Sequence, residues 1–196
     1  MKEAFTVQYD VNKYMELIRE KLSPYRFHHS VCVAKAAVQL AEKYGADVDR
    51  AFLAGLLHDI TKEMPPEEQI RWIKQGNLPF GEVERRSPAV YHQMSGAVYV
   101  RDALQIDDGE VFTAIRFHTT ACAGMPKLAK VLYLADFISD DRQYPDVETM
   151  RAKAYEGLDA GMLYALEYTI KDVVGKQRVL HPDTTSAYNE IIMKEK

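Results

Sequence analysis

Apolar residues recur along this chain mostly at spacings of three and four, which is the period of an amphipathic α-helix. The first stripe ends at Ser23-Pro24 and consists of Val11, Tyr14, Met15, Ile18 and Leu22. Convincing alternation with a period of two, which would indicate β-strands, is absent from the sequence. The pattern therefore predicts an all-α fold.

Glycine and proline residues divide this pattern into separate helices. Ser23 is a predicted N-cap, because proline is well tolerated at the first helical position, and Gly45 is a predicted C-cap. A long helix near the C-terminus could break at Gly157 and Gly161. The expected helices cover about residues 11–22, 24–44, 47–60, 64–76, 88–104, 108–118, 126–139, 147–173 and 184–194.

Length and composition are typical of one globular domain. The chain has 196 residues, of which 47% are hydrophobic and 28% are charged, and this is enough for one sizeable core. We therefore expect a single helical-bundle domain over residues 1–196. Its core would cover about residues 22–175, and a C-terminal helix over about 184–194 would pack on that core.

The charge balance argues against binding to nucleic acid or to an anionic membrane. The formal net charge is −4 and the pI is near 5.9, whereas such partners favour clustered lysine and arginine. The segment MKEAFTVQYD lacks the apolar core of a signal peptide, and no stretch approaches the roughly 18 apolar residues of a membrane span. Cys32 and Cys122 form no C-x-x-C pair and predict no disulfide framework. We expect a soluble, cytoplasmic protein.

Four histidines and two aspartates interrupt the apolar faces of the predicted helices. The segment GLLHDITK places His58 and Asp59 side by side at the end of an apolar helix, where a buried charge needs a partner or a metal. His118 shares a helix face with Val111 and Ile115, seven and three residues before it. The complete inward-facing set is His29, His58, Asp59, His92, His118 and Asp136.

Any one of these six residues could be a satisfied core histidine or a capping aspartate. Together they indicate a metal site, because neutral imidazoles and ionised carboxylates suit divalent cations. The absence of cysteine from the set points to iron, manganese, magnesium, cobalt or zinc. Ligands drawn from several helices build the metal sites of bundle cores, and six ligands can hold two metals. We therefore expect a two-metal site that hydrolyses a phosphoanhydride or phosphoester.

The order His29, then His58-Asp59, then Asp136 resembles the HD-domain metal phosphohydrolase superfamily, and the additional His92 and His118 resemble the ligands of its two-metal branch. A closer resemblance, to the bacterial YqeK family of symmetrical diadenosine tetraphosphate hydrolases, spans about residues 22–190. It rests on YRFHHSVCVA, LAGLLHDITK, YHQMSGAVYV, AIRFHTTACAGMPKLAKVLYLADFISDDRQYP and LHPDTTSAYN. The resemblance implies that all six residues are metal ligands.

The resemblance also implies the reaction. An enzyme of this family would cleave diadenosine tetraphosphate and related dinucleoside polyphosphates symmetrically, so that diadenosine tetraphosphate gives two ADP molecules. A hydroxide bridging two metals, with iron as the leading candidate, would attack, and the catalytic residues would be Asp59, Lys62 and His58. The sequence departs from the family at Ala121, where a glycine is expected after His-Thr-Thr. It departs again at ADFISDDR, which differs from Ala-Asp-Lys-Ile-Glu-Pro-x-Arg.

Phosphate contacts must come from side chains, since the sequence has no Walker-type glycine loop. Lys62 lies one helical turn past His58 and could reach a phosphate as a point charge. Arg26 lies three residues before His29 and could clamp a phosphate bidentately. Further candidates for substrate contact are Arg142, Thr119, Thr120, Tyr144 and His181. Each of these residues could instead lie on the surface or cap a helix.

Two alternative functions fit the same residues. An HD enzyme could act on another nucleotide, for example as a phosphodiesterase, although HTTACAGMP lacks the second histidine and the D-G-x-G motif of the cyclic-di-GMP branch. A nucleotide sensor would bind metal and ADP or GDP without turnover, and loss of a ligand would mark it. The expected partners are a dinucleoside polyphosphate substrate and a nucleoside diphosphate product, and a homodimer is the default assembly.

Overall fold

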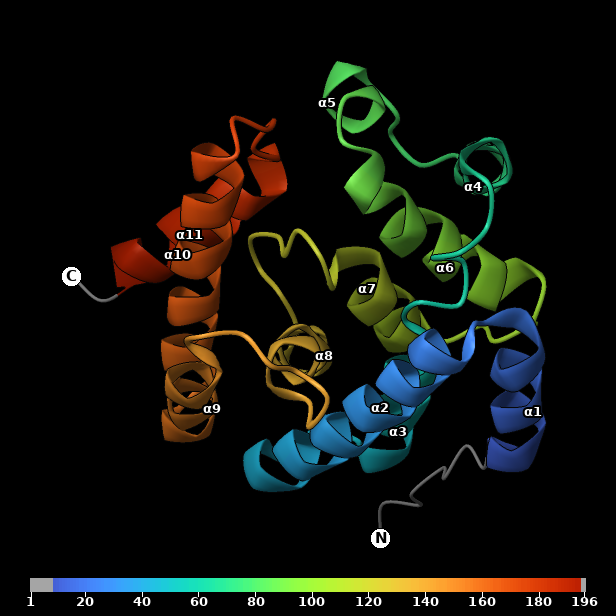
Figure 1. Cartoon of the computed structure of the whole chain (residues 1–196), viewed down its shortest axis with the longest axis horizontal. Coiled ribbons are helices and arrows are strands. Elements are labelled where there is room, and N and C mark those ends of the chain that lie inside the picture. Colours follow the sequence, from blue (N-terminus) through green and yellow to red (C-terminus); the bar gives the residue numbers. More distant parts are fainter. Residues whose placement is uncertain (1–8, 195–196) are drawn as a thin grey trace, which may run out of the picture.

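The fold is built from helices, and the computed structural model describes residues 9–194 (Figure 1). Within this range every regular element is helical, as the apolar spacing predicts. The elements are α1 Val11–Lys21, α2 Pro24–Tyr44, α3 Val48–Leu57, α4 Pro66–Gln75, α5 Glu82–Arg85, the 3-10 helix η1 Pro88–Val90, α6 Tyr91–Asp102, α7 Gly109–Phe117, α8 Lys127–Ile138, α9 Val147–Glu156, α10 Leu158–Gly175 and α11 Pro182–Lys194. The segment MKEAFTVQYD, which lacks the pattern of a signal peptide, covers residues 1–10 and lies largely outside the described residues.

The α8 helix lies at the centre of this arrangement (Figure 1). The α2 and α3 helices pack against it on one side, α7 packs on another, and α9 and α10 pack on a third. The α6 helix packs on α7 and on α4, and α11 packs on α10. Because helices approach α8 from several directions, side chains far apart in sequence can meet beside it.

The helix ends follow local backbone chemistry. The Ser23 side chain accepts a hydrogen bond from the backbone N–H of Arg26 and caps α2, and Gly45 ends α2 with a φ of 65° in the left-handed region. Both caps confirm the sequence predictions. Gly157 separates α9 from α10, whereas Gly161 lies inside α10 and lets that helix pack closely on α9.

The α3 helix ends earlier than the sequence predicts. It stops at Leu57, and residues 58–63 form tight turns held by hydrogen bonds such as that from the Lys62 N–H to the Asp59 carbonyl. These turns bury both His58 and Asp59, although adjacent residues of a continuous helix would point about 100° apart. The shortened helix therefore lets two neighbouring polar side chains face the interior together.

The segment before α6 also differs from the prediction of one helix over residues 88–104. The structure begins it with η1, which Pro88 opens, and α6 follows from Tyr91. The short α5 helix precedes them and is absent from the sequence prediction. Four residues carry too little periodicity to be recognised as a helix from sequence.

Two glycines lie on helices next to the polar residues, and one of them lets two helices approach closely. A Cβ on Gly55 would lie 2.6 Å from the Cα of Ala34, so α3 can pack at this distance from α2 only without a side chain there. A Cβ on Gly96 would lie 3.4 Å from the Thr61 hydroxyl oxygen and 3.5 Å from the His58 carbonyl oxygen. These are ordinary van der Waals distances, so Gly96 lies against the turn after α3 without an unusually close approach.

One large cluster of buried apolar residues extends from Tyr14 on α1 to Ile191 on α11. A smaller cluster consists of Ile73, Val90, Tyr91 and Met94, and it joins α4 to α6. The large cluster is consistent with a single domain. That one domain covers all of residues 1–196 stays a prediction. Among the helices that the structure describes, none is both long and apolar enough to cross a membrane.

We expect replacement of Gly55 by alanine to lower the free energy of unfolding by about 1–3 kcal/mol, because overpacking forces α2 and α3 apart. Urea denaturation followed by circular dichroism measures this change. Gly175→Ala is the matched control, since a Cβ at Gly175 meets no atom within 4 Å. A Gly55→Ala protein as stable as the control would contradict the close packing of these helices.

Candidate metal centre

Six polar side chains from different parts of the chain converge in the interior beside α8. His29 lies on α2, His92 on α6 and Asp136 on α8, while His58-Asp59 and His118 follow the last residues of α3 and α7. All four histidines and Asp59 are at most 2% exposed. Their ligand atoms form three groups in which all atoms lie within 4.8 Å of one another: His29, His58 and Asp59; His58, His118 and Asp136; and Asp59, His92 and His118.

The Asp59 carboxylate lies between two sets of histidines. Its Oδ2 atom is 3.5 Å from Nε2 of His58, while its Oδ1 atom is 3.3 Å from Nε2 of His92 and 3.8 Å from Nε2 of His118. The two oxygens therefore face different imidazoles. A carboxylate in this position can bridge two cations.

Three histidines have a hydrogen-bond acceptor at Nδ1 that orients the ring. Nδ1 of His58 lies 2.7 Å from the Gly55 carbonyl oxygen, and Nδ1 of His118 lies 2.7 Å from the Ile115 carbonyl oxygen. Nδ1 of His29 lies 2.7 Å from an oxygen of Asp141. A carbonyl only accepts, so Nδ1 of His58 and of His118 must carry the proton. Each ring then directs the lone pair of Nε2 toward the cluster, which is the arrangement of metal-bound histidine.

The cluster fits a cation. Nε2 of His58 is fully buried and has no hydrogen-bond partner among residues 9–194. Nε2 of His92 and Nε2 of His118 lie only 3.0 Å apart. An unpaired buried nitrogen costs free energy, and two facing lone pairs repel each other, unless a cation or proton lies between the donors. Nitrogen and oxygen donors without sulfur suit a divalent metal, and we conclude that this cluster binds divalent metal.

The protonation states of His58, His92 and the two carboxylates favour metal binding as well. Burial lowers the pKa of His58 to about 4, and burial together with Lys62 lowers the pKa of His92. Burial alone raises the pKa of Asp59, but the neighbouring histidines and Lys62 outweigh it and hold that pKa well below its ordinary value. Burial likewise opposes ionisation of Asp136, and Arg142 and the histidines again lower its pKa well below the ordinary value. Near pH 7 the His58 and His92 imidazoles are neutral and both carboxylates are ionised.

Three predicted phosphate-binding cations lie at the edge of the cluster. Arg26 donates to Oδ2 of Asp59 at 2.7 Å, and Arg142 donates to the Asp136 carboxylate and, at 2.7 Å, to the Asp136 carbonyl. Nζ of Lys62 lies 3.0 Å from Nε2 of His92 and 3.9 Å from Oδ1 of Asp59. Between 21% and 34% of each side chain is exposed, so all three can also reach a ligand that approaches from solvent.

The two predicted threonines have different surroundings. The Thr119 hydroxyl lies 3.1 Å from Nε2 of His92 and so belongs to the cluster edge. The Thr120 hydroxyl is buried and donates to the Ala121 carbonyl at 2.9 Å. Ala121 is buried with a φ of 57°, a left-handed conformation that favours glycine. The departure from the expected glycine at this position therefore carries backbone strain but leaves the turn intact.

Tyr144 and His181 lie apart from the histidine cluster. The Tyr144 hydroxyl donates to the Phe137 carbonyl at 3.0 Å, and its ring packs against Tyr168 with centroids 5.3 Å apart. His181 lies 3.3 Å from an oxygen of Glu84, and its Nδ1 accepts a hydrogen bond from the Asp183 N–H. Of these two residues, His181 lines a cavity near the cluster, whereas the Tyr144 ring is packed against Tyr168.

That cavity has a volume of about 710 Å³ and lies between the α5–η1 segment and the ends of α10 and α11. Thr119 and Thr120 form its inner side, next to His92, and Arg86 and Arg178 also line it. No aspartate or glutamate is among its lining residues, all of which belong to the described part of the chain. Its lining therefore presents arginine side chains and threonine hydroxyl groups to an anion.

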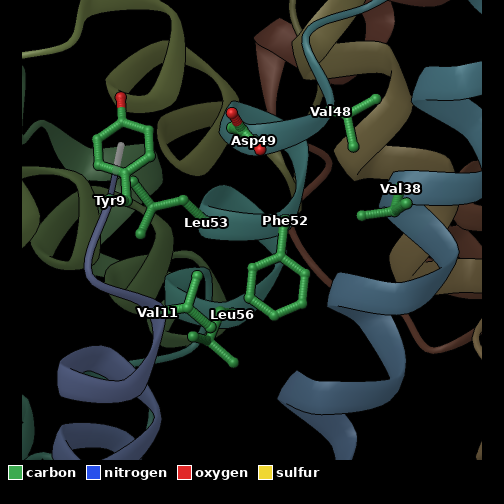
Figure 2. Close-up of a pocket in the computed structure, with 8 residues that line it drawn as sticks. All are labelled: Tyr9, Val11, Val38, Val48, Asp49, Phe52, Leu53 and Leu56. Carbon is green, nitrogen blue, oxygen red and sulfur yellow. The ribbon is translucent and has the colours of Figure 1, made fainter. Parts of the chain in front are cut away.

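A second cavity, of about 680 Å³, is apolar and separate (Figure 2). Val11, Val38, Val48 and Phe52 point into it from α1, α2 and α3. It shares no lining residue with the histidine cluster, and a single carboxylate, Asp49, lies among its described walls. Its chemistry suits packing of apolar groups rather than phosphate.

Asp141 and Gln93 contact the predicted site residues but do not stand out in the sequence. Gln93 is fully buried, and its side-chain oxygen accepts from the N–H groups of Thr119 and Thr120 at 2.9 and 3.2 Å. Asp141 lies within ADFISDDR, the segment that departs from the expected family motif. That departure is the signal in the sequence that could have identified Asp141.

Comparisons with known proteins agree with this geometry. The family model described as HD domain matches residues 26–140. The symmetrical bis(5'-nucleosyl)-tetraphosphatase of Halalkalibacterium halodurans is 34% identical over 94% of this chain and 98% of its own length. The Bacillus subtilis protein of the same name is 31% identical over 89% and 94%. A crystal structure from Clostridium acetobutylicum, described as a predicted HD superfamily hydrolase involved in NAD metabolism, matches with a TM-score of 0.92 and 33% identity, covering 95% of this chain and 99% of that chain.

We expect manganese to stabilise the chelator-treated protein. A ligand at 100 times its Kd adds about 2.7 kcal/mol, which corresponds to a rise of roughly 5–10 °C in Tm for a domain of this size. Differential scanning calorimetry measures the rise. Asp59→Asn should abolish it, whereas Asp49→Asn, a change at an exposed aspartate of α3, should retain it. Equal responses of the two variants would show that manganese binds elsewhere.

Proposed function

The chain belongs to the HD-domain family, within it to the symmetrical bis(5'-nucleosyl)-tetraphosphatases, and we propose that its His/Asp cluster hydrolyses diadenosine tetraphosphate to two ADP molecules. The observation that carries this proposal is the convergence of six ionisable residues in one interior cluster, in which Nε2 of His58 has no hydrogen-bond partner among residues 9–194. Related dinucleoside polyphosphates would share the reaction, because the site would contact the polyphosphate that they have in common.

We propose that the six residues hold two metals. His29, His58, Asp59 and Asp136 would hold one, and Asp59, His92 and His118 the other, with Asp59 shared because its two oxygens face different histidines. The donor set admits iron, manganese, cobalt, magnesium and zinc, and iron is our leading candidate. When bound, the metals lower the pKa of a water molecule and neutralise charge on phosphoryl oxygens.

The protein's own residues supply the rest of the chemistry. His58 and Asp59 are held by the Gly55 carbonyl and by Arg26, so that neither needs to rearrange during the reaction. Such preorganisation lowers the barrier, because fixed charges need no reorientation as charge develops. The proposal needs no serine or cysteine nucleophile, because water would attack phosphorus directly as the P–O bond to the departing ADP breaks.

Phosphate binding falls to the cations at the edge of the cluster. Burial lowers the pKa of Lys62, and its ammonium group lies beside His92, where a bound cation would repel it toward an incoming phosphate. Arg26 and Arg142 would each bind phosphate through the N–H groups that their carboxylate partners leave free. The Thr119 hydroxyl would donate to a phosphate beside His92.

The cavity between α5–η1 and the ends of α10 and α11 would receive one nucleoside of the substrate. Its volume of about 710 Å³ is in the usual range for a small-molecule pocket. Pro88, Val90 and Leu180 provide apolar surface for a base, while Arg86 offers positive charge. His181, whose Nε2 atom lies beside Glu84, would contact the nucleotide at one end of the cavity. Thr120 would contact it at the inner side of the cavity. Tyr144 would act indirectly by supporting the loop after α8.

Three further features belong to the proposal. The enzyme would act in the cytoplasm, where its nucleotide substrate occurs. Its products would be nucleoside diphosphates, and ADP or GDP would bind the same pocket. A homodimer is the expected assembly, because two-fold dimers are the commonest oligomers.

The proposal predicts that the metal-loaded protein converts diadenosine tetraphosphate to ADP as sole product, since attack at a phosphorus of the central bridge releases ADP from both halves. Anion-exchange separation of the nucleotides measures the products. Asp59→Ala, which removes the shared ligand, should abolish ADP formation. AMP together with ATP would place the cleavage at a different phosphoanhydride bond and contradict the symmetrical reaction. Failure of the wild type to turn over with iron, manganese or cobalt would contradict the assigned substrate.

We expect Lys62→Met to lower kcat by roughly 10²–10³-fold, because the loss of a cation near the transferring phosphate leaves developing charge unbalanced. Metal binding should persist, since the six ligands are unchanged. Steady-state kinetics together with the metal-induced rise in Tm separate the two effects. Lys74→Met, a change at an exposed lysine of α4, should leave kcat as in the wild type. An unchanged kcat in Lys62→Met would remove Lys62 from the mechanism.

A further inference from the structure

We propose that Asp141 is the positioning residue of His29: its carboxylate orients the imidazole and raises the affinity of the centre for its metal. The inference rests on the proposed role of His29 as a ligand. Oδ2 of Asp141 lies 2.7 Å from Nδ1 of His29, and 7% of the Asp141 side chain is exposed. Asp141 itself would not touch the metal or the substrate. It would act only through the ring of His29.

The contact selects which nitrogen of His29 faces the cluster. With Nδ1 bound to Asp141, Nε2 points to the Asp136 carboxylate, 3.0 Å away. If the imidazole ring were rotated by 180° about its Cβ–Cγ bond, the Cδ2 carbon would face Asp141 in place of Nδ1, and this hydrogen bond would be lost. The carboxylate therefore holds one orientation and one tautomer of the ligand.

Of the three cluster histidines whose Nδ1 atom has an acceptor, only His29 takes that acceptor from a different segment of the chain. His58 and His118 follow the last residues of α3 and α7, where helix carbonyls are free, and each uses the carbonyl three residues before it. His29 lies inside α2, where the carbonyls are occupied by the helical hydrogen-bond ladder. An acceptor for its Nδ1 must therefore come from elsewhere in the fold, and Asp141 provides it.

Asp141 is itself held in place. The Ser139 hydroxyl donates to Oδ1 of Asp141 at 2.7 Å, which leaves Oδ2 for His29. Arg151 on α9 donates to the carbonyls of Ile138 and Ser139, each at 3.1 Å, and ties the end of α8 to α9. The chain Arg151, Ser139, Asp141, His29 thus runs from a neighbouring helix to the ligand. Fixed outer partners of this kind tune metal affinity.

The test is manganese binding to chelator-treated protein, measured by the electron paramagnetic resonance signal of free Mn²⁺. We expect Asp141→Ala to weaken binding about 10–100-fold, the range found for loss of such outer partners. Asp141→Asn should weaken it less, because a carboxamide oxygen still accepts from Nδ1 but carries no charge. Asp140→Asn is the matched control, since Asp140 is exposed and adjacent, and it should bind as the wild type does.

A double-mutant cycle separates positioning from loop stability. Ser139→Ala should weaken manganese binding in the wild type but add nothing in Asp141→Ala, because Ser139 acts through Asp141. Wild-type affinity in Asp141→Ala, or independent effects of the two changes, would overturn the inference while leaving the metal centre in place. Absence of manganese binding to the wild type itself would overturn the metal centre and this inference together. The Tm in chelator, expected to match that of Asp140→Asn, reports any loss of fold.

Discussion

The structure depends on keeping ionised carboxylates and neutral imidazoles together in a helical core. Taking a carboxylate out of water costs several kcal/mol unless it is paired. Asp59 is 2% exposed, and its two oxygens meet Arg26 and the Nε2 atoms of three histidines. The backbone around it follows from this need. The α3 helix stops at Leu57, and the two adjacent polar residues that follow turn inward.

The cluster is held more firmly on one side than on the other. On the side of α2, α8 and α9, hydrogen bonds from arginines and Ser139 occupy the acceptors around His29 and Asp136. On the opposite side, Thr119 leads into the cavity lined by Arg86 and Arg178. The first side can hold ligands rigidly, while the second can admit an anionic substrate. A hydrolase needs both properties, since a fixed metal site must exchange nucleotides with solvent.

Arginine has two tasks at such a site. Arg26 and Arg142 balance the charge of Asp59 and Asp136, which keeps both carboxylates ionised although burial opposes ionisation. Each guanidinium has several N–H donors in a planar fork, so pairing with one carboxylate leaves donors for a phosphate. Lys62 is not paired with a single carboxylate in this way. Its ammonium group lies at the edge of the cluster, near both His92 and Asp59.

The sequence by itself determined the helical class, the caps at Ser23 and Gly45, and the six inward-facing residues, because these depend on local spacing and on the cost of burying unpaired charge. Only the tertiary structure decided their contacts. It shows Asp59 between two sets of histidines, Tyr144 packed against Tyr168, and His181 beside Glu84. Asp141 joins His29 across 112 positions of the chain. Periodicity says which face of a helix is buried, but not which faces meet, since that depends on packing between helices distant in sequence.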